Sequence, residues 1–360
     1  MGGIIAHEQT RQSRHRDCRL RDNQCFNIMT RTDVRLALPS KGRLQEATLQ
    51  FLSQCGFDVR ISATRSYTAT IPALPEVTVV FQRPRDITIS VANGGVDFGI
   101  TGLDVVHEAG VAGKVRMIHD ELGYGKCKLV IAVPDSWSDV KNMDQLRARA
   151  QATDAPVRVA TVFPRLAEQF LRAQGLRHEI VEAEGSLEVM PEIGSADLIC
   201  DLVETGNTLI QNRLRMIEGG TVIETQSVLL ANDANLARPA VMRIAVQLIE
   251  AIEAHLRAQG KLMIWANVRG DSLEDVGRTV TMRTSLGGLQ GATIAHIFPN
   301  PHSAKENPDV NWFSVNVVVI RSELQDAINQ LRGIGASGVV VTPITYIFEQ
   351  QPLRVAALRG

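Results

Sequence analysis

The sequence lacks the features that mark several large classes of protein. Its 360 residues contain five scattered cysteines and no Cys-x-x-Cys pair, which argues against a disulfide framework or a zinc site and favours a reducing, cytoplasmic location. No apolar run approaches the roughly 20 residues that cross a bilayer, so we expect a soluble protein with no membrane partner. The 38 basic and 39 acidic residues nearly cancel, so no basic field attracts nucleic acid.

Length and the first residues set expectations for domain organisation. A chain of 360 residues exceeds the usual size of one hydrophobic core, which predicts two or three domains. Residues 1–32 carry several arginines among acids and have no apolar segment of the secretory kind, so we expect a disordered tail and not a signal peptide. Met29 stands just before the first strand-like run and is the expected natural start.

Strand-like runs alternate with helical patterns from residue 33 onward. Val34–Gly56 reads as a strand, a Lys-Gly turn and a helix, and such alternation predicts α/β architecture with largely parallel sheets. Further strands are expected at Val77–Phe81, Phe98–Thr101, Lys128–Val133, Val157–Thr161, Glu179–Val181, Leu198–Asp201 and Val222–Leu230. Chain crossings after Pro134 and near Gln226 predict two lobes with a cleft, where small ligands bind. The predicted division is lobe I over 33–134 and 226–259, and lobe II over 135–225.

A different pattern follows the amphipathic helix at 240–259. Its order is βαββαβ, the ferredoxin-like unit, which we expect to form a small regulatory domain over residues 260–350. A tail is expected over 351–360. The predicted elements are strand 261–268, helix 272–280, strand 292–298, strand 312–320, helix 322–333 and strand 338–343.

The segment Asp197–Leu209, DLICDLVETGNTL, carries the most chemical information. An apolar strand closes on Asp201, and a Thr-Gly-Asn-Thr turn then opens the next helix. Successive backbone N–H groups and the hydroxyls of Thr205 and Thr208 suit a monophosphate, and the acid would lie at the height of a sugar's hydroxyls. These residues predict a ribose 5-phosphate site. An ordinary strand end with a Thr or Asn N-cap would carry the same pattern.

The segment also resembles the phosphoribosyl pyrophosphate loop of the ATP phosphoribosyltransferase family. The resemblance extends from Val34 to Glu349 through six ordered blocks: LALPSKGRL, FQRPRDITISVANGGVDFGITGLDVV, LGYGKCKLVIAVP, VATVFPRLAEQFL, GSLEVMPEIGSADLICDLVETGNTL and GASGVVVTPI. It implies two periplasmic-binding-protein-like lobes with a central cleft, plus a C-terminal ferredoxin-like (βαββαβ) regulatory domain. By this resemblance, the terminal domain would be that of the long, self-regulated form of the enzyme, which catalyses the first step of histidine biosynthesis.

The resemblance also assigns binding residues by position. Phosphoribosyl pyrophosphate is expected on Asp201, Glu204, Thr205, Gly206, Asn207 and Thr208. ATP or pyrophosphate is expected on Lys41, Arg43, Arg83 and Asp97, with Asp86 nearby, because guanidinium groups suit phosphate oxygens. Lys41 and Arg43 could also be solvated turn charges.

Three acids are the candidate catalytic residues: Asp201, Glu188 and Asp197. Glu188 would contact the adenine or assist proton handling, although it could also serve as a helix N-terminal acid after Ser186. The histidines form no usable constellation, and no Ser-His-Asp or Cys-His arrangement is evident.

The implied reaction is substitution at the anomeric carbon of the ribose. N1 of adenine attacks, pyrophosphate leaves and phosphoribosyl-ATP forms, so positioning and charge stabilisation would dominate catalysis and no protein nucleophile is needed. Mg²⁺ is the expected cofactor. Mg²⁺ would bridge phosphate oxygens of the substrates and keep some of its water ligands, so we assign it no protein ligands.

Regulation is expected in the terminal domain. By resemblance, histidine would bind there as an inhibitor near Leu286, Ala292 and Thr293, although these residues could also form a plain hairpin turn. Such pockets usually form between neighbouring subunits, which implies a homo-oligomer, either a dimer or a hexamer.

Two other functions fit parts of the sequence. Two α/β lobes with a double crossing also describe a solute-binding protein, although the chain shows no signal peptide. A non-catalytic regulatory paralogue would keep the fold; Thr225 and Gln226 stand where family members often carry arginine, so one substrate-side cation would be missing. The loop at 300–311 is also longer than expected.

Overall fold

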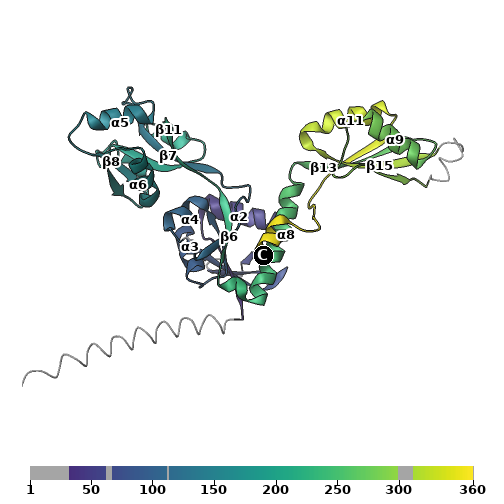
Figure 1. Cartoon of the computed structure of the whole chain (residues 1–360), viewed down its shortest axis with the longest axis horizontal. Coiled ribbons are helices and arrows are strands. Elements are labelled where there is room, and N and C mark those ends of the chain that lie inside the picture. Colours follow the sequence, from purple (N-terminus) through teal and green to yellow (C-terminus); the bar gives the residue numbers. More distant parts are fainter. Residues whose placement is uncertain (1–31, 62–66, 112, 299–310, 360) are drawn as a thin grey trace, which may run out of the picture. The chain divides into compact units, whose positions relative to one another are not determined.

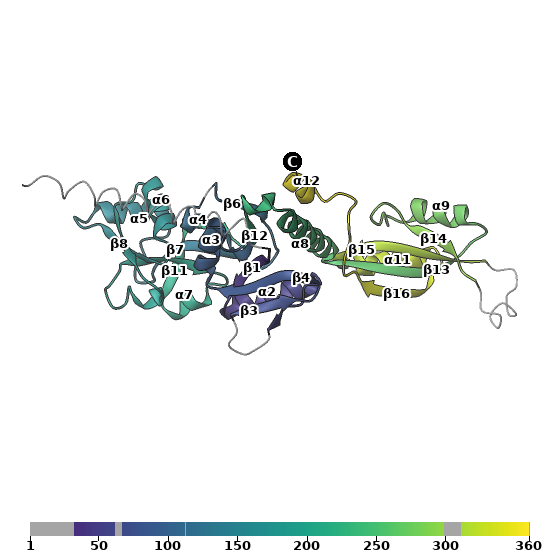
Figure 2. The same ribbon diagram turned by 90° about the horizontal axis from the view of Figure 1, so that it is seen from below.

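The structure, a computed structural model, describes residues 32–61, 67–111, 113–298 and 311–359. It divides into two compact units, one formed by the chain up to Ile249 with the residues from Leu353 onward, and the other by Glu250–Pro352. Figures 1 and 2 show the elements of each unit from two directions. The tail expected over 1–32 lies outside the described residues, apart from its last residue. None of the described helices is long and apolar enough to span a membrane.

Lobe I of the first unit is built on a seven-stranded sheet with the order β2-β3-β4-β1-β5-β12-β6. β1 pairs in parallel with β4 and β5, whereas β12 runs antiparallel to β5 and β6. β1 is buried along most of its length, which explains its nearly continuous apolar sequence. The strands are β1 Val34–Pro39, β2 Arg60–Ile61, β3 Thr68–Ile71, β4 Leu74–Gln82, β5 Phe98–Gly102, β6 Val115–His119 and β12 Ser227–Asn232; the helices are α2 Gly42–Gln54, α3 Pro84–Ala92, α4 Leu103–Ala109, η2 Asn235–Ala237 and α8 Pro239–Ala258, whose residues from Glu250 onward belong to the second unit.

Lobe II is built on a five-stranded sheet with the order β11-β7-β10-β8-β9. β10, β8 and β9 are parallel, so their carboxyl ends share one edge, while β7 runs antiparallel to β10. A separate apolar core lies between this sheet and its helices. The strands are β7 Cys127–Pro134, β8 Val157–Thr161, β9 His178–Glu182, β10 Leu198–Val203 and β11 Leu214–Thr225; the helices are α5 Met143–Gln151, α6 Pro164–Ala173, η1 Leu187–Val189 and α7 Asn207–Gln211.

The chain crosses between the lobes earlier than the sequence predicts. β7 is hydrogen-bonded between β11 and β10, so residues 127–134 belong to lobe II and the crossing precedes Cys127 instead of following Pro134. The single strand expected over Val222–Leu230 is two strands. β11 ends at Thr225 in one sheet and β12 begins at Ser227 in the other, so the return crossing is made at one residue.

The second unit carries the predicted βαββαβ order. Its four strands form one antiparallel sheet in the order β14-β15-β13-β16, which is the ferredoxin-like arrangement. Alternating buried residues on β13 and β15 face an apolar core with two helices. The elements are β13 Lys261–Arg269, α9 Leu273–Arg283, β14 Thr293–His296, β15 Trp312–Ile320, η3 Arg321–Glu323, α11 Leu324–Gly333 and β16 Ser337–Pro343. Most of the long loop at 300–311 lies outside the described residues.

The residues expected as a terminal tail form a helix instead, α12 Leu353–Arg359, which belongs to the first unit. Val355 and Leu358 are buried, and the helix contacts β6. The guanidinium of Arg354 donates to Asp120 at 2.6 Å. The i, i+3 spacing of Val355 and Leu358 gives α12 an apolar inner face, so the prediction of a tail is wrong here.

The fold class is confirmed. The chain is α/β, with two mixed sheets in the first unit and a four-stranded antiparallel sheet in the second.

Candidate active site

The loop between β10 and α7 forms a compact turn at the carboxyl edge of the lobe II sheet. Gly206 has φ +80°, a left-handed conformation that glycine adopts without strain. A Cβ there would meet only Val203, at 3.9 Å, so the backbone angle and not lack of space requires glycine. Glu204, Thr205 and Thr208 are exposed, so their polar groups are available to a ligand.

This loop lines a pocket of about 220 Å³ that also contains two of the candidate acids, Asp201 and Glu188. Asp201 follows the buried strand residue Cys200, and its Oδ1 accepts the N–H of Leu202 at 2.7 Å. Burial, opposed in part by this hydrogen bond and assisted by the charge of Glu188, raises the pKa of Asp201 to about 6. The carboxylates of Asp201 and Glu188 therefore face one space, and a positively charged group in this space would be stabilised by them.

Glu188 depends on an unusual backbone. Ser186, two residues earlier, has φ +53° and ψ +40°, one of two left-handed non-glycine residues in the described chain. Such a conformation is costly for a residue with a Cβ and often lies at functional sites. The sequence carried no signal for it beyond the preceding glycine.

Arg43 joins the loop from lobe I. Its Nη1 donates to Glu204 Oε2 at 2.8 Å, and both side chains remain largely exposed, at 88% and 55%. An ion pair this exposed contributes little stability, so a phosphate could take the guanidinium from Glu204 at small cost.

Two other predicted cations meet at a second pocket. Lys41 and Arg83 line a space of about 630 Å³ at the carboxyl ends of β1 and β4, together with Asp86 and Gln82. The structure thus brings the first strand-helix turn and the turn before α3 together.

Asp97 lies elsewhere. It precedes β5 at the opposite edge of the sheet and is fully buried. Its carboxylate accepts the N–H of Arg35 at 2.8 Å, the Asn235 amide at 2.8 Å and the Arg238 guanidinium at 2.9 Å. A carboxylate with this many partners holds its own lobe together.

Asp197 occupies the corresponding place in lobe II. It precedes β10, and its carboxylate accepts the backbone N–H of Arg158 and the guanidinium of the same residue, each at 2.8 Å. Burial alone would raise the pKa of Asp197, but these bonds and the Arg158 charge outweigh it and hold that pKa below its usual range. The loop Glu204–Thr208 lies at the other end of β10.

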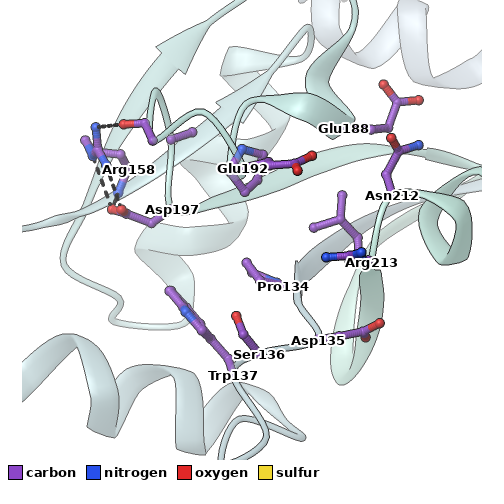
Figure 3. A pocket seen from close by; sticks show the side chains of 14 residues that line it. Pro134, Asp135, Ser136, Trp137, Arg158, Glu188, Glu192, Asp197, Asn212 and Arg213 are labelled. Atoms are coloured by element: carbon purple, nitrogen blue, oxygen red, sulfur yellow. Dashed lines mark hydrogen bonds and ion pairs between the residues drawn. The ribbon is translucent and has the colours of Figure 1, made fainter.

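Figure 3 shows the pocket of about 370 Å³ beside this ion pair. Arg158 and Asp197 stand on one side of it, while Glu188, Asn212 and Arg213 stand on the other. Glu188 also lines the 220 Å³ pocket. Of the candidate catalytic acids, Asp201 and Glu188 line the 220 Å³ pocket, whereas Asp197 shares only the 370 Å³ pocket with Glu188.

The block LGYGKCKLVIAVP adds two lysines that the sequence pattern did not identify as site residues. Lys126 and Lys128 line a pocket of about 820 Å³ with Glu204 and Thr205 of the loop. Lys128 pairs with Glu224 at 2.6 Å. Two lysines beside a strand within a family block were the available signal.

Thr225, where a cation is expected in the family, serves a structural role. Its hydroxyl donates to Asp104 Oδ1 at 2.7 Å and accepts the Asp104 N–H at 2.9 Å. Both residues are buried. Neighbouring Gln226 donates to the carbonyl of Asp120 at 3.4 Å.

Comparisons with known proteins identify the family. The family model described as ATP phosphoribosyltransferase matches residues 83–254, and the model for the HisG C-terminal domain matches 258–346. ATP phosphoribosyltransferase 2, chloroplastic, of Arabidopsis thaliana is 37% identical over 338 residues, covering 92% of this chain and 81% of that protein. The chain belongs to the ATP phosphoribosyltransferase family. The enzyme of Gemmatimonas aurantiaca is 34% identical, over 86% of this chain and 98% of that protein.

A solved ATP phosphoribosyltransferase complex from Thermotoga maritima is 25% identical, with a TM-score of 0.49, over 61% of this chain and 98% of that one. The activity of an ATP phosphoribosyltransferase is the first step of histidine biosynthesis, and its HisG C-terminal domain implies regulation by histidine.

In that terminal domain, the effector candidates lie around β14. Leu286 and Ala292 pack against the domain core, whereas Thr293 begins β14 and is exposed. Thr293 is therefore the member of the set with a side chain open to a ligand.

Proposed function

We propose that this ATP phosphoribosyltransferase holds phosphoribosyl pyrophosphate on the loop Glu204–Thr208 and joins it to ATP beside Asp201 and Glu188. The observation that carries the proposal is the acidic pocket itself. Two carboxylates face one space, the phosphate loop closes it, and an exposed arginine reaches it from the other lobe.

The loop and the acids would divide the substrate between them. The hydroxyls of Thr205 and Thr208, with the loop N–H groups, would donate to the 5-phosphate. Asp201 would accept hydrogen bonds from the ribose hydroxyls. As pyrophosphate departs, the anomeric carbon gains positive charge, and the carboxylates of Asp201 and Glu188 would stabilise it electrostatically.

Cations from lobe I would hold the polyphosphates. Arg43 would exchange Glu204 for the leaving pyrophosphate, while Lys41 and Arg83 would bind the nucleotide's phosphates in the 630 Å³ pocket. Adenine N1 has a free lone pair, so the lobes would act mainly by bringing it to the anomeric carbon. Asp97 and Asp197 would have structural roles, because their carboxylates bind Arg238 and Arg158 at the amino ends of β5 and β10.

Magnesium fits the same pocket. The described residues include no group of three or more His, Cys, Asp or Glu side chains that could hold a metal alone. The oxygens of Asp201 and Glu188 are the hard donors that Mg²⁺ prefers, and substrate phosphates would complete its coordination. When bound, Mg²⁺ would neutralise charge on the pyrophosphate.

Three further properties remain predictions. Histidine would inhibit by binding the second unit near Thr293, and the enzyme would be a homo-oligomer, a dimer or a hexamer, which sedimentation would measure. The cytoplasm stays the predicted location, although the Arabidopsis relatives are named as chloroplastic.

The direct test uses the full chain with ATP, phosphoribosyl pyrophosphate and Mg²⁺, followed by the near-ultraviolet absorbance of phosphoribosyl-ATP. The wild type should form product and Asp201→Asn should form far less. A non-catalytic paralogue would form none in either case. Equal rates for the two proteins would remove Asp201 from the site.

A further inference from the structure

Helix α4 lies between the two lobes of the catalytic unit. It follows β5 and so belongs to lobe I by connectivity, and Leu103 and Val106 pack against the lobe I core. Val105, however, packs against the core of lobe II. Figures 1 and 2 both draw α4 next to α6, which it contacts. One short helix therefore gives an apolar face to each lobe.

Both ends of α4 are bonded to lobe II. At its start, Asp104 and Thr225 exchange the two buried hydrogen bonds described above. At its end, Glu108 Oε1 accepts the N–H of Arg165 and Oε2 accepts the N–H of Leu166, each at 3.0 Å.

The second contact supplies what α6 lacks. α6 begins at Pro164, which has no N–H, and its N-cap residue Phe163 makes no side-chain capping bond. The next two N–H groups need acceptors, and both find them on one carboxylate from the other lobe. The fit is close: a Cβ on Gly110, just after α4, would lie 1.6 Å from Arg165 Nη1.

The contact stands at the edge of lobe II that carries the proposed site. β8 and β10 are parallel, so the start of α6 and the loop Glu204–Thr208 emerge from the same edge of their sheet. Helix α4 of lobe I thus contacts lobe II at the edge that carries the proposed phosphate loop.

We propose that Glu108 is a positioning residue for phosphoribosyl transfer. Glu108 caps the N-terminus of α6 from lobe I and so fixes the angle between the lobes. This angle would determine how ATP on lobe I is oriented towards the ribose on lobe II. The inference rests on the proposed phosphate loop. Its consequence is specific: removing the carboxylate should leave phosphoribosyl pyrophosphate bound to lobe II but misplace the attacking nucleotide. A displacement of about 1 Å between reacting groups can lower a rate by about 100-fold.

A matched control separates positioning from simple helix capping. Asn142 caps α5 of the same lobe by accepting the Gln145 N–H at 2.9 Å, and both residues are on lobe II. Glu108 and Asn142 are similarly half-buried. Glu108→Ala and Asn142→Ala should both lower the Tm of the full chain by a few degrees, about as cap losses do.

The experiment measures the Kd of phosphoribosyl pyrophosphate with Mg²⁺ by calorimetry, kcat by product absorbance well below the Tm, and the distance between spin labels on the two lobes. Glu108→Ala should keep the Kd within about twofold, lower kcat by about 10- to 100-fold and broaden the label distances. Glu108→Gln retains one acceptor oxygen and should fall between. Asn142→Ala should keep kcat and the distances.

Two outcomes overturn the proposal. If Glu108→Ala changes only the Tm, as Asn142→Ala does, Glu108 is a cap and nothing more. If Glu108→Ala no longer binds phosphoribosyl pyrophosphate, the contact made by α4 supports the phosphate loop directly and does not act through the angle between the lobes. Failure of the wild type itself to bind phosphoribosyl pyrophosphate would be a different result, because it would reject the proposed loop and not the role of Glu108.

Discussion

Replacing Asp201 by asparagine should inactivate the enzyme while making its catalytic unit more stable. The pKa of Asp201 is raised from 3.8 to about 6, chiefly by burial, so the folded protein holds the proton more tightly than the unfolded chain. Ionising Asp201 therefore costs folding free energy. A neutral asparagine avoids that cost and can still accept the Leu202 N–H.

The magnitude follows from the shift. About two pKa units at 1.36 kcal/mol each give an upper bound of roughly 3 kcal/mol, and partial solvent access reduces the expected gain to about 1–2 kcal/mol. The sign fixes the pH window. Well below pH 3.8 both states are protonated and asparagine gains nothing; the gain should grow as the pH rises from 3.8 towards about 6 and level off at higher pH.

The assay uses a tryptophan as a local reporter. The chain has three tryptophans, of which Trp137 lies in the catalytic unit and Trp265 and Trp312 lie in the second unit. In a background of Trp265→Phe and Trp312→Phe, urea unfolding followed by Trp137 fluorescence reports lobe II at pH 4 and pH 8. A gain of the same size at both pH values would refute the reasoning, as would an unchanged kcat in Asp201→Asn.

Four further predictions concern the neighbouring groups. Thr208→Ala and Gly206→Val should raise the KM for phosphoribosyl pyrophosphate far more than the KM for ATP, since losing a charge-assisted hydrogen bond costs about 1.5–3 kcal/mol; equal effects on both substrates would count against the loop. Asp197→Asn should weaken the Arg158 bond and destabilise lobe II by about 1–3 kcal/mol near neutral pH, with no change in kcat per folded enzyme. Because the pKa of Asp197 is lowered, this destabilisation should shrink as the pH falls through that pKa. A large fall in kcat would instead show that Asp197 belongs to the active site. Thr293→Asp should weaken histidine inhibition by about tenfold, within the usual range of coupling energies, and leave kcat without histidine unchanged; an unaltered histidine titration would exclude this residue. Chelating Mg²⁺ should abolish product formation and weaken phosphoribosyl pyrophosphate binding in calorimetry, and adding Mg²⁺ back should restore both; turnover that survives the chelator would remove the metal from the proposal.

The strands were predictable where a local pattern decides the structure. Val157–Thr161 and Trp312–Ile320 match β8 and β15 residue for residue, because one is a buried parallel strand and the other alternates between faces. An apolar run does not say which sheet it joins. The strand predicted over Lys128–Val133 therefore exists as part of β7, but it was assigned to lobe I and pairs in the sheet of lobe II.

The candidate site was predictable in part for the same reason. Asp201 and the loop after it are consecutive in sequence, so one motif locates them. Asp97 and Asp197 also flank strands, and the sequence does not show whether an acid beside a strand binds substrate or has a structural role. Their partners Arg35 and Arg158 are 62 and 39 residues away, so only the folded chain distinguishes a structural carboxylate from a substrate contact.

The return of the chain as α12 changes how regulation can be dissected genetically. The second unit is an internal segment of the catalytic unit's sequence, since Leu353–Arg359 packs in the catalytic unit and Arg354 pairs with Asp120. A stop codon after Gln259 would remove the regulatory strands and this helix together. Loss of activity in such a deletion would therefore say nothing about whether the second unit supplies catalytic groups. A deletion that tests this question has to keep α12.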